Sequence, residues 1–292
     1  MTKPAFNGNI SIERRGYIMA IYVMGEIHGC FKEFASMMKR INAGEKDRIL
    51  LVGDYIDRGP SSFEMLKWLE KRPKNVFPVK GNHDVDYATY IKILRHLDAR
   101  EELHTNPDSP EDMKVLYDTA VEITSNPGET ELADLMASID DFDKFGTIAE
   151  IMKKHKATLR QFNDWAFMLA SYPYYYRFKY KEKEIVVVHA GYAPAVTDIP
   201  GKYHGLEDFY LHAREESIRF GGFEGGIVVA GHTPTIAKKM YCFTEGRIFK
   251  HINEDKNCTF YNVDCGCAYR EVTPYGRMCC LRIDDEVVYY GD

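Results

Sequence analysis

The heptapeptide Gly53-Asp54-Tyr55-Ile56-Asp57-Arg58-Gly59 constrains this chain more than any other stretch. It follows the run 48–52, which is typical of a buried strand because it is short, aliphatic and closed by a glycine. Two carboxylates and a guanidinium therefore stand on a turn at the carboxyl end of a strand. Open α/β sheets bind their ligands at this edge, so we expect a polar site there.

Two similar turns flank this one. A strand-like run upstream leads into Gly25-Glu26-Ile27-His28-Gly29, and another downstream leads into Gly81-Asn82-His83-Asp84. Glu26, Asp54 and Asn82 are spaced 28 residues apart, which is about the length of one βαβ unit. Oxygen donors and imidazoles thus converge along one sheet edge, which is the chemistry of a metal site.

The composition is that of an ordinary globular chain, with 292 residues of which 45% are apolar and 28% charged. The net charge of −6 argues against general binding to nucleic acid or to an anionic membrane. No apolar run approaches the ~20 residues of a membrane-spanning helix, and no secretory signal is evident. The seven cysteines are odd in number and lack zinc-finger spacing, which indicates reduced thiols in a cytoplasmic protein.

Helical periodicity marks the connections between the turns. Apolar side chains recur at helical spacing in 31–41 and 61–71, as expected of crossovers between parallel strands. Residues 85–170 contain several helical patterns and no strand, so we expect an all-helical insertion that either shapes substrate access or only packs. The predicted domains are a peripheral extension over 1–18 and a single domain over 19–292 that carries the insertion.

Strands resume after the insertion. Residues 174–180 and 184–188 flank the charged turn Lys181-Glu182-Lys183, which predicts a hairpin. Residues 205–219 are expected to form one helix and 227–230 a strand, and the remainder of the chain is expected to be sheet and turns.

These turns resemble the calcineurin-like metallophosphoesterases, within them the phosphoprotein phosphatase branch of the bacterial serine/threonine protein phosphatase type. The family pattern is GDxHG, GDxxDRG, GNH followed by Glu or Asp, a His before Ala/Gly-Gly, and Gly-His. The chain keeps the second and third motifs and carries Val188-His189-Ala190-Gly191 and Ala230-Gly231-His232, but Glu26 stands where the family has Asp. The resemblance covers roughly residues 20–84 and 165–290. It implies an α/β (α+β) fold, a four-layer sandwich of two mixed β-sheets flanked by helices.

The resemblance also implies two divalent cations held by six side chains: Glu26, His28, Asp54, Asn82, His189 and His232. The first three would hold one cation, Asp54 would bridge to the second, and the last three would complete that one. A mixture of imidazole and oxygen ligands suits Mn, Fe or Zn better than Mg, and Mn is the metal that we expect.

The implied reaction is hydrolysis of a phosphate ester by in-line attack of a hydroxide that bridges the cations. His83 would protonate the leaving oxygen, and Asp57 would hold its imidazole. Arg58 would bind the phosphate oxygens through its planar fork of donors. Arg214 matches the family's second phosphate-binding arginine more loosely, and an exposed helical Arg paired with a Glu is the alternative. Asp84 would support the ligands from behind.

The expected activity is hydrolysis of phosphomonoesters, namely phosphoserine, phosphothreonine or phosphotyrosine in proteins. Two alternatives stay open: a symmetrical diadenosine tetraphosphatase, which shares these motifs, and a metal-binding or regulatory module weakened by Glu26. The expected partner is a phosphorylated protein or a small phosphoester, with no nucleic acid and no membrane. The oligomeric state is not determined by the sequence.

Glu26 keeps the charge of the family's Asp but adds one methylene. Because ligand distances tolerate only ~0.2 Å of error, we expect the first site to bind metal more weakly than the second. We also expect Glu26→Asp to raise first-site affinity and turnover.

Overall fold

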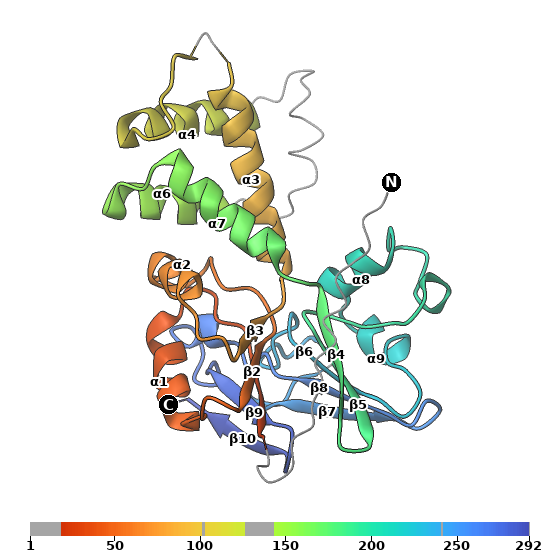
Figure 1. The fold of residues 1–292 in the computed structure, drawn as a ribbon. Coiled ribbons are helices and arrows are strands. Elements are labelled where there is room, and N and C mark those ends of the chain that lie inside the picture. The colour runs from red at the N-terminus through yellow and green to blue at the C-terminus, as the bar shows by residue number, and fades with distance from the viewer. Residues whose placement is uncertain (1–18, 101–102, 126–142, 241, 292) are drawn as a thin grey trace.

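Two five-stranded sheets stacked against each other form the centre of the molecule (Figure 1). The structure, a computed structural model, describes residues 19–100, 103–125, 143–240 and 242–291. Each sheet contains both parallel and antiparallel pairs, as the sequence predicts. The predicted peripheral extension over 1–18 lies outside the described residues.

The first sheet has the strand order β10-β9-β1-β2-β3, in which β1, β2 and β3 run parallel and β9 and β10 are antiparallel. Its strands are β1 (Ile21–Met24), β2 (Arg48–Leu51), β3 (Val76–Pro78), β9 (Cys279–Arg282) and β10 (Val287–Tyr290). The three parallel strands are mostly buried, which explains their nearly continuous apolar sequences. Their carboxyl ends therefore lie together at one edge.

The second sheet has the order β4-β5-β6-β8-β7. Its three central strands β5, β6 and β8 are parallel, and the edge strands β4 and β7 pair antiparallel with β5 and β8. Its strands are β4 (Tyr175–Tyr180), β5 (Lys183–Val188), β6 (Ile227–Ala230), β7 (Phe249–Asn253) and β8 (Cys258–Asn262). The predicted hairpin is present as β4 and β5.

Side-chain alternation along β1 shows how the layers are built. Ile21 and Val23 lie in the apolar layer between the sheets, together with Val187 and Val229 of the second sheet. Successive residues of a strand point to opposite faces, so the neighbours of Ile21 and Val23 pack on the other side, against helices. These helices are α1 (Phe31–Ile41) and α2 (Ser62–Glu70), while α8 (Leu206–His212) and α9 (Glu216–Arg219) pack on the outer face of the second sheet. The predicted four-layer sandwich is confirmed.

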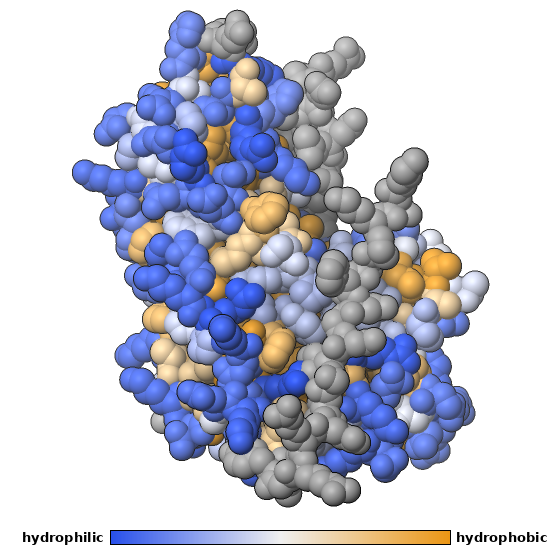
Figure 2. Space-filling view, in the orientation of Figure 1, coloured by the Kyte–Doolittle hydropathy of each residue, from blue (hydrophilic) through white to orange (hydrophobic). Residues whose placement is uncertain are grey.

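A helical lobe connects β3 to β4 and rises above the sheets (Figure 1). Its described helices are α3 (Asn82–Asp98), α4 (Pro110–Ser125), α6 (Asp143–His155) and α7 (Leu159–Ser171). Phe63 of α2 stacks on His155 of α6 with ring centroids 3.7 Å apart, which fastens the lobe to the sandwich. Figure 2 shows hydrophobic residues gathered where the lobe meets the sheets, within a mainly hydrophilic surface. The helical prediction is correct for the described part of the insertion, although α3 begins at Asn82 rather than after the motif.

The expected single helix over 205–219 is wrong. It is broken at Ala213, whose backbone is extended (φ −62°, ψ 131°), and this break separates α8 from α9. Two short 3-10 helices, η2 (Val196–Asp198) and η3 (Cys267–Tyr269), complete the described elements.

All seven cysteines are buried and unpaired by disulfides. Among the described residues, no helix is both long and apolar enough to cross a bilayer.

Candidate active site

The predicted site residues meet where the carboxyl ends of both sheets lie side by side. The first sheet contributes the turns after β1, β2 and β3, and the second contributes the turns after β5 and β6. Five of these residues adopt the left-handed backbone region, with φ between 44° and 70°: His28, Asp54, Asp57, Arg58 and His232. Non-glycine residues rarely adopt this conformation, and such strained positions concentrate at functional sites.

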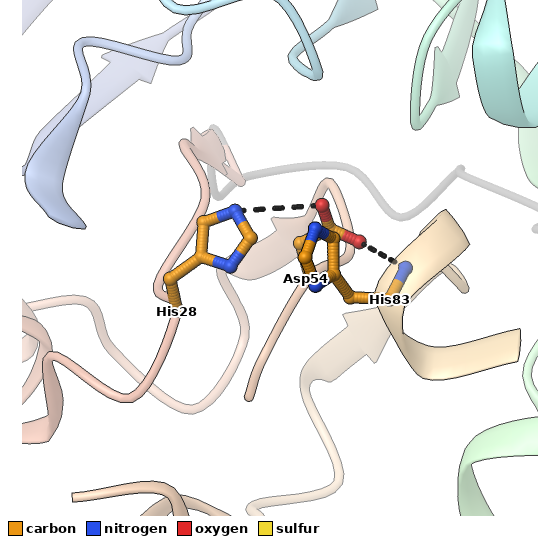
Figure 3. A group of neighbouring side chains, drawn as sticks. All are labelled: His28, Asp54 and His83. Carbon is orange, nitrogen blue, oxygen red and sulfur yellow. Dashed lines mark hydrogen bonds and ion pairs between the residues drawn. The ribbon is translucent and has the colours of Figure 1, made fainter. Parts of the chain in front are cut away.

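Asp54 lies at the centre of a first cluster with His28 and His83 (Figure 3). Its Oδ2 is 3.4 Å from Nε2 of His28, and its Oδ1 accepts a 3.0 Å hydrogen bond from the main-chain amide of His83. Oε2 of Glu26 is 3.1 Å from the same Nε2 of His28. The three residues predicted to hold the first cation are therefore close together.

Asp54 also belongs to a second cluster with His189 and His232. Nε2 of His189 is 3.6 Å from Oδ2 of Asp54 and 3.1 Å from Nδ1 of His232. The same nitrogen is 3.0 Å from Oδ1 of Asn82. The predicted bridging position of Asp54 agrees with this geometry.

Main-chain carbonyls fix the tautomers of two histidines. Nδ1 of His28 is 3.0 Å from the carbonyl of Ile56, and Nδ1 of His189 is 2.8 Å from the carbonyl of Val52. A carbonyl can only accept, so each Nδ1 carries a proton, and in the neutral imidazole each Nε2 presents a lone pair towards Asp54. Lone pairs on nitrogen and on carboxylate oxygen repel each other unless a cation lies between them. The nitrogen and carboxylate oxygen atoms therefore suit divalent metal ions as ligands. Histidines that bind metals are commonly oriented by a hydrogen bond from the other ring nitrogen to a main-chain carbonyl, as here.

His83 and Asp57 form a hydrogen-bonded pair beside the first cluster. Nδ1 of His83 is 2.8 Å from Oδ2 of Asp57, whose main-chain amide donates to Oγ of Ser62 at 3.1 Å. Both side chains are buried. This contact suits the predicted roles of His83 as proton donor and Asp57 as orienting carboxylate, and both roles stay predictions. The side chain of His83 is also near enough to His28 and Asp54 to bind a cation together with them.

Arg58 spans the space between two imidazoles. Its Nη1 is 3.2 Å from Nε2 of His28 and its Nη2 is 3.0 Å from Nε2 of His83. The guanidinium also lies over the ring of Tyr269, 5.7 Å from its centroid. A cation–π contact of this kind helps to position the guanidinium, whose terminal nitrogens face the two imidazoles.

Asp84 holds the turn that carries Asp54. Its Oδ2 accepts from the main-chain amides of Asp54 and Gly81, at 2.9 and 2.8 Å, and its Oδ1 accepts from that of Tyr55 at 3.2 Å. The side chain is completely buried. This geometry suits the predicted supporting role.

Arg214 lies in the break between α8 and α9 rather than within a helix, and it is exposed. It is near enough to His232 for its charge to contribute to lowering the pKa of that imidazole, after burial and His189. The predicted helical location is wrong, while the predicted function in phosphate binding remains open.

Burial and mutual charge set the protonation of the clustered acids when only protein groups are counted. Burial, followed by the charge of Asp54, raises the pKa of Glu26 to about 7. Burial would also raise the pKa of Asp54, but the four surrounding imidazoles, beginning with His189, outweigh it and lower that pKa below its ordinary value. Asp54 is thus the group that stays ionised most readily.

Two residues near the clusters are absent from the sequence prediction. Asp264 follows β8 at the same sheet edge and is buried, and burial followed by the charge of Glu26 raises its pKa well above the ordinary value. His212 lies edge-on to His232, with ring centroids 6.3 Å apart, and its Nδ1 is 2.7 Å from a carboxylate oxygen of Asp208. A carboxylate at the end of the strand-like run 260–264 was the available signal for Asp264, whereas no sequence motif marks His212.

The family model described as calcineurin-like phosphoesterase matches residues 19–236, more than half of the chain. A symmetrical bis(5'-nucleosyl)-tetraphosphatase of Wigglesworthia glossinidia brevipalpis is 35% identical over 99 residues, which are 34% of this chain and 36% of that protein. The protein of the same description from Haemophilus ducreyi is 37% identical over 94 residues, 31% of this chain and 35% of that protein. The chain thus aligns with about a third of the length of these relatives.

Among solved structures, a protein serine/threonine phosphatase from Saccharomyces cerevisiae has a TM-score of 0.49 and 16% identity, covering 94% of this chain and 80% of that one. Similarity at this level carries no information on the substrate.

The expectation of a phosphoprotein phosphatase is wrong. The curated relatives are described as symmetrical tetraphosphatases of dinucleotides, which corresponds to the alternative that shares the same motifs. The motifs provide the phosphate chemistry common to both activities, and they contain nothing that distinguishes a phosphorylated side chain from a polyphosphate chain.

Proposed function

The chain belongs to the calcineurin-like phosphoesterase family, and from this premise we propose that it hydrolyses bis(5'-nucleosyl) tetraphosphates symmetrically, giving two nucleoside diphosphates. The description shared by the curated relatives supports this substrate. The geometric observation that carries the proposal is a pair of metal-ligand clusters that share Asp54, with the guanidinium of Arg58 beside the first cluster. The charge of Arg214 also acts on His232 of the second cluster. Together these groups would balance the negative charge of a chain of four phosphates.

Glu26, His28 and Asp54 would hold one divalent cation, and Asp54, Asn82, His189 and His232 the other. The donor set suits Mn, Fe or Zn, and Mn remains the metal that we propose. When bound, the cations would neutralise phosphate oxygens and make water a stronger nucleophile at neutral pH.

The remaining side chains orient the substrate and move a proton. Arg58 would bind a phosphate through its two terminal nitrogens, held in place by Tyr269. His83 would carry the transferable proton on Nε2 while Asp57 accepts the proton of Nδ1 and stabilises the imidazolium. Both side chains of this pair are buried, which strengthens their interaction.

In the proposed reaction, water attacks the second phosphorus and the bridging P–O bond to the third phosphorus breaks. The oxygen of water stays on one product, and the leaving oxygen of the other takes the proton from Nε2 of His83. The proton that water releases passes to solvent, and solvent protonates His83 again. One water is consumed and two nucleoside diphosphates form. A cytoplasmic location is part of the proposal and is supported by the seven cysteines without disulfides.

Product analysis tests the proposal. Protein supplied with Mn²⁺ should convert bis(5'-adenosyl) tetraphosphate into ADP alone, and a chelator should abolish the reaction. Formation of AMP and ATP would contradict the symmetrical cleavage. Turnover of phosphopeptides but not of the dinucleotide would contradict the substrate, and no turnover of any phosphoester would favour a regulatory metal-binding module.

A further inference from the structure

Glu26 connects the two sheets across the site. It follows β1 of the first sheet, and His232, which lies 206 residues later, follows β6 of the second. Oε1 of Glu26 accepts a hydrogen bond from the main-chain amide of His232, while Oε2 faces Nε2 of His28 at 3.1 Å. The carboxylate is only 3% exposed. One side chain thus contacts a member of each cluster.

The hydrogen bond between Glu26 and His232 lies in the turn that positions the His232 imidazole in the second cluster. His232 adopts a left-handed backbone with φ of 67°, a conformation that is unfavourable for a non-glycine residue. The amides on either side have other acceptors, because Gly231 donates to the carbonyl of His189 after β5 and Thr233 donates to the carbonyl of Gly231. The amide of His232 donates instead to Glu26. Nδ1 of His232 is thereby held 3.1 Å from Nε2 of His189.

The longer side chain is required for this reach. Asp is shorter than Glu by one carbon–carbon bond, roughly 1.5 Å, so its carboxylate could not contact both His28 and the amide of His232. The surroundings leave room for Glu: a Cβ added at Gly231 would come within 2.9 Å of Oε1 of Glu26 and 3.0 Å of a methyl group of Val52. Gly231 and Glu26 therefore fit together as a pair.

We infer that Glu26 is a positioning residue for the second cluster, in addition to its predicted contribution to the first. Its carboxylate holds the His232 turn in the conformation that aims the imidazole at His189 and Asp54. The residue that departs from the family pattern is thus integrated into this chain's site. The expectation drawn from the resemblance concerns the first site, whereas these contacts predict that Asp at position 26 should weaken the second site.

Two substitutions separate the effect of the negative charge of Glu26 from the effect of its side-chain length. Glu26→Gln keeps the length and an acceptor oxygen for the amide of His232 but removes the charge. Glu26→Asp keeps the charge and removes the reach. Mn²⁺ is titrated calorimetrically into chelator-stripped wild type and both variants, and the binding steps are assigned by their loss in His28→Ala and in His232→Ala.

We expect Glu26→Asp to lower second-site affinity about tenfold or more, because a hydrogen bond to a charged group is lost. Glu26→Gln should keep second-site affinity within about threefold of wild type while weakening the first site through the lost charge. An unchanged second step in Glu26→Asp, or an equal loss of that step in both variants, would overturn the inference. Circular dichroism and urea unfolding establish that each variant is folded.

Gly231→Ala provides an independent test, and it decides the question if Glu26→Asp fails to fold. Its methyl group should displace Oε1 of Glu26 and weaken the second step. A wild-type second step in folded Gly231→Ala would contradict the inference. The inference rests on the proposed function only through the metals, and the titration contains no substrate, so failure of the tetraphosphate assay would leave this result interpretable.

Discussion

At the scale of single residues, several carboxylates of this site accept hydrogen bonds from main-chain amides instead of contacting the substrate. Asp84 accepts three buried amides, and Glu26 accepts one across the sheets. The turns that carry the ligands are in strained backbone conformations, as Asp54 and His232 illustrate. These acceptors therefore offset the cost of the geometry that places the ligands.

Asp84→Ala should destabilise the protein by at least about 3 kcal/mol, since three buried amides would each lose an acceptor at a cost of ~1–3 kcal/mol. Urea unfolding of the metal-free protein measures the change. Asp84→Asn is the matched control: its amide oxygen can still accept from Asp54 and Gly81, so it should lose clearly less. Equal effects of the two substitutions would show that the acceptor oxygens do not account for the stability.

His83→Asn should retain both metals and lose activity in proportion to the basicity of the leaving oxygen, because a poor leaving group depends most on proton donation. The loss should reach ~10²–10⁴-fold for alkyl phosphates and be smaller for aryl phosphates. Rates over a series of esters and a Mn²⁺ titration provide the measurements. Loss of a metal-binding step would instead identify His83 as a ligand, which its position near His28 and Asp54 also allows.

At the scale of elements, α3 joins the helical lobe to the site directly. Its first turn carries Asn82 and His83, and its later turns pack against α7. The last residues of α7 return to the loop after β3, because Nζ of Lys80 donates to the carbonyl of Ala170 at 2.7 Å. Lys80 directly precedes the motif that begins at Gly81, so both ends of the lobe contact this segment.

Phe167→Ser should raise KM for the dinucleotide about fivefold or more and leave the turnover of p-nitrophenyl phosphate unchanged. Phe167 is 77% exposed on α7, and an aromatic ring that stacks on a base contributes ~1–3 kcal/mol. Val115→Ser, at an exposed apolar position of α4, serves as the control and should change neither. A collapse of both activities in folded Phe167→Ser would mean that α7 supports the catalytic residues instead.

Regular periodicity explains which elements could be predicted from the sequence. The expected helix 31–41 coincides with α1, because its apolar face repeats without interruption. The start of α3 was missed because polar motif residues occupy its first turn, and the break after α8 was missed because the extended conformation of Ala213 has no local signal. The metal-site residues were identified through motifs, whereas the Glu26 contact depends on a partner in the other sheet, which no local pattern reveals.

At the scale of the whole molecule, the candidate site is a joint between the two sheets. Nδ1 of His189 donates to the carbonyl of Val52, and Glu26 accepts from the amide of His232, so each bond connects one sheet to the other. Metal ions held by ligands from both sheets would add a further connection. Metal binding should therefore stabilise the whole sandwich.

Mn²⁺ at about 100 times its dissociation constant should raise the free energy of unfolding by ~2.7 kcal/mol per site. Thermal unfolding with Mn²⁺ and with a chelator measures this shift. His189→Ala should reduce the shift, because the second cluster loses a ligand, whereas His96→Ala, on the exposed face of α3, should preserve it. A shift unaffected by His189→Ala would place the stabilising metal elsewhere.

The 206-residue separation of Glu26 and His232 also has a consequence for the order in which the protein is made. A ribosome synthesises Glu26, His28 and Asp54 long before His189 and His232, and the parallel strands of the first sheet can pair while the second sheet does not yet exist. During that interval the carboxylates of the first cluster lack their imidazole partners from the second sheet. The nascent chain can hold only the first cation, and the complete metal pair can assemble only after the turn that follows β6 has left the ribosome.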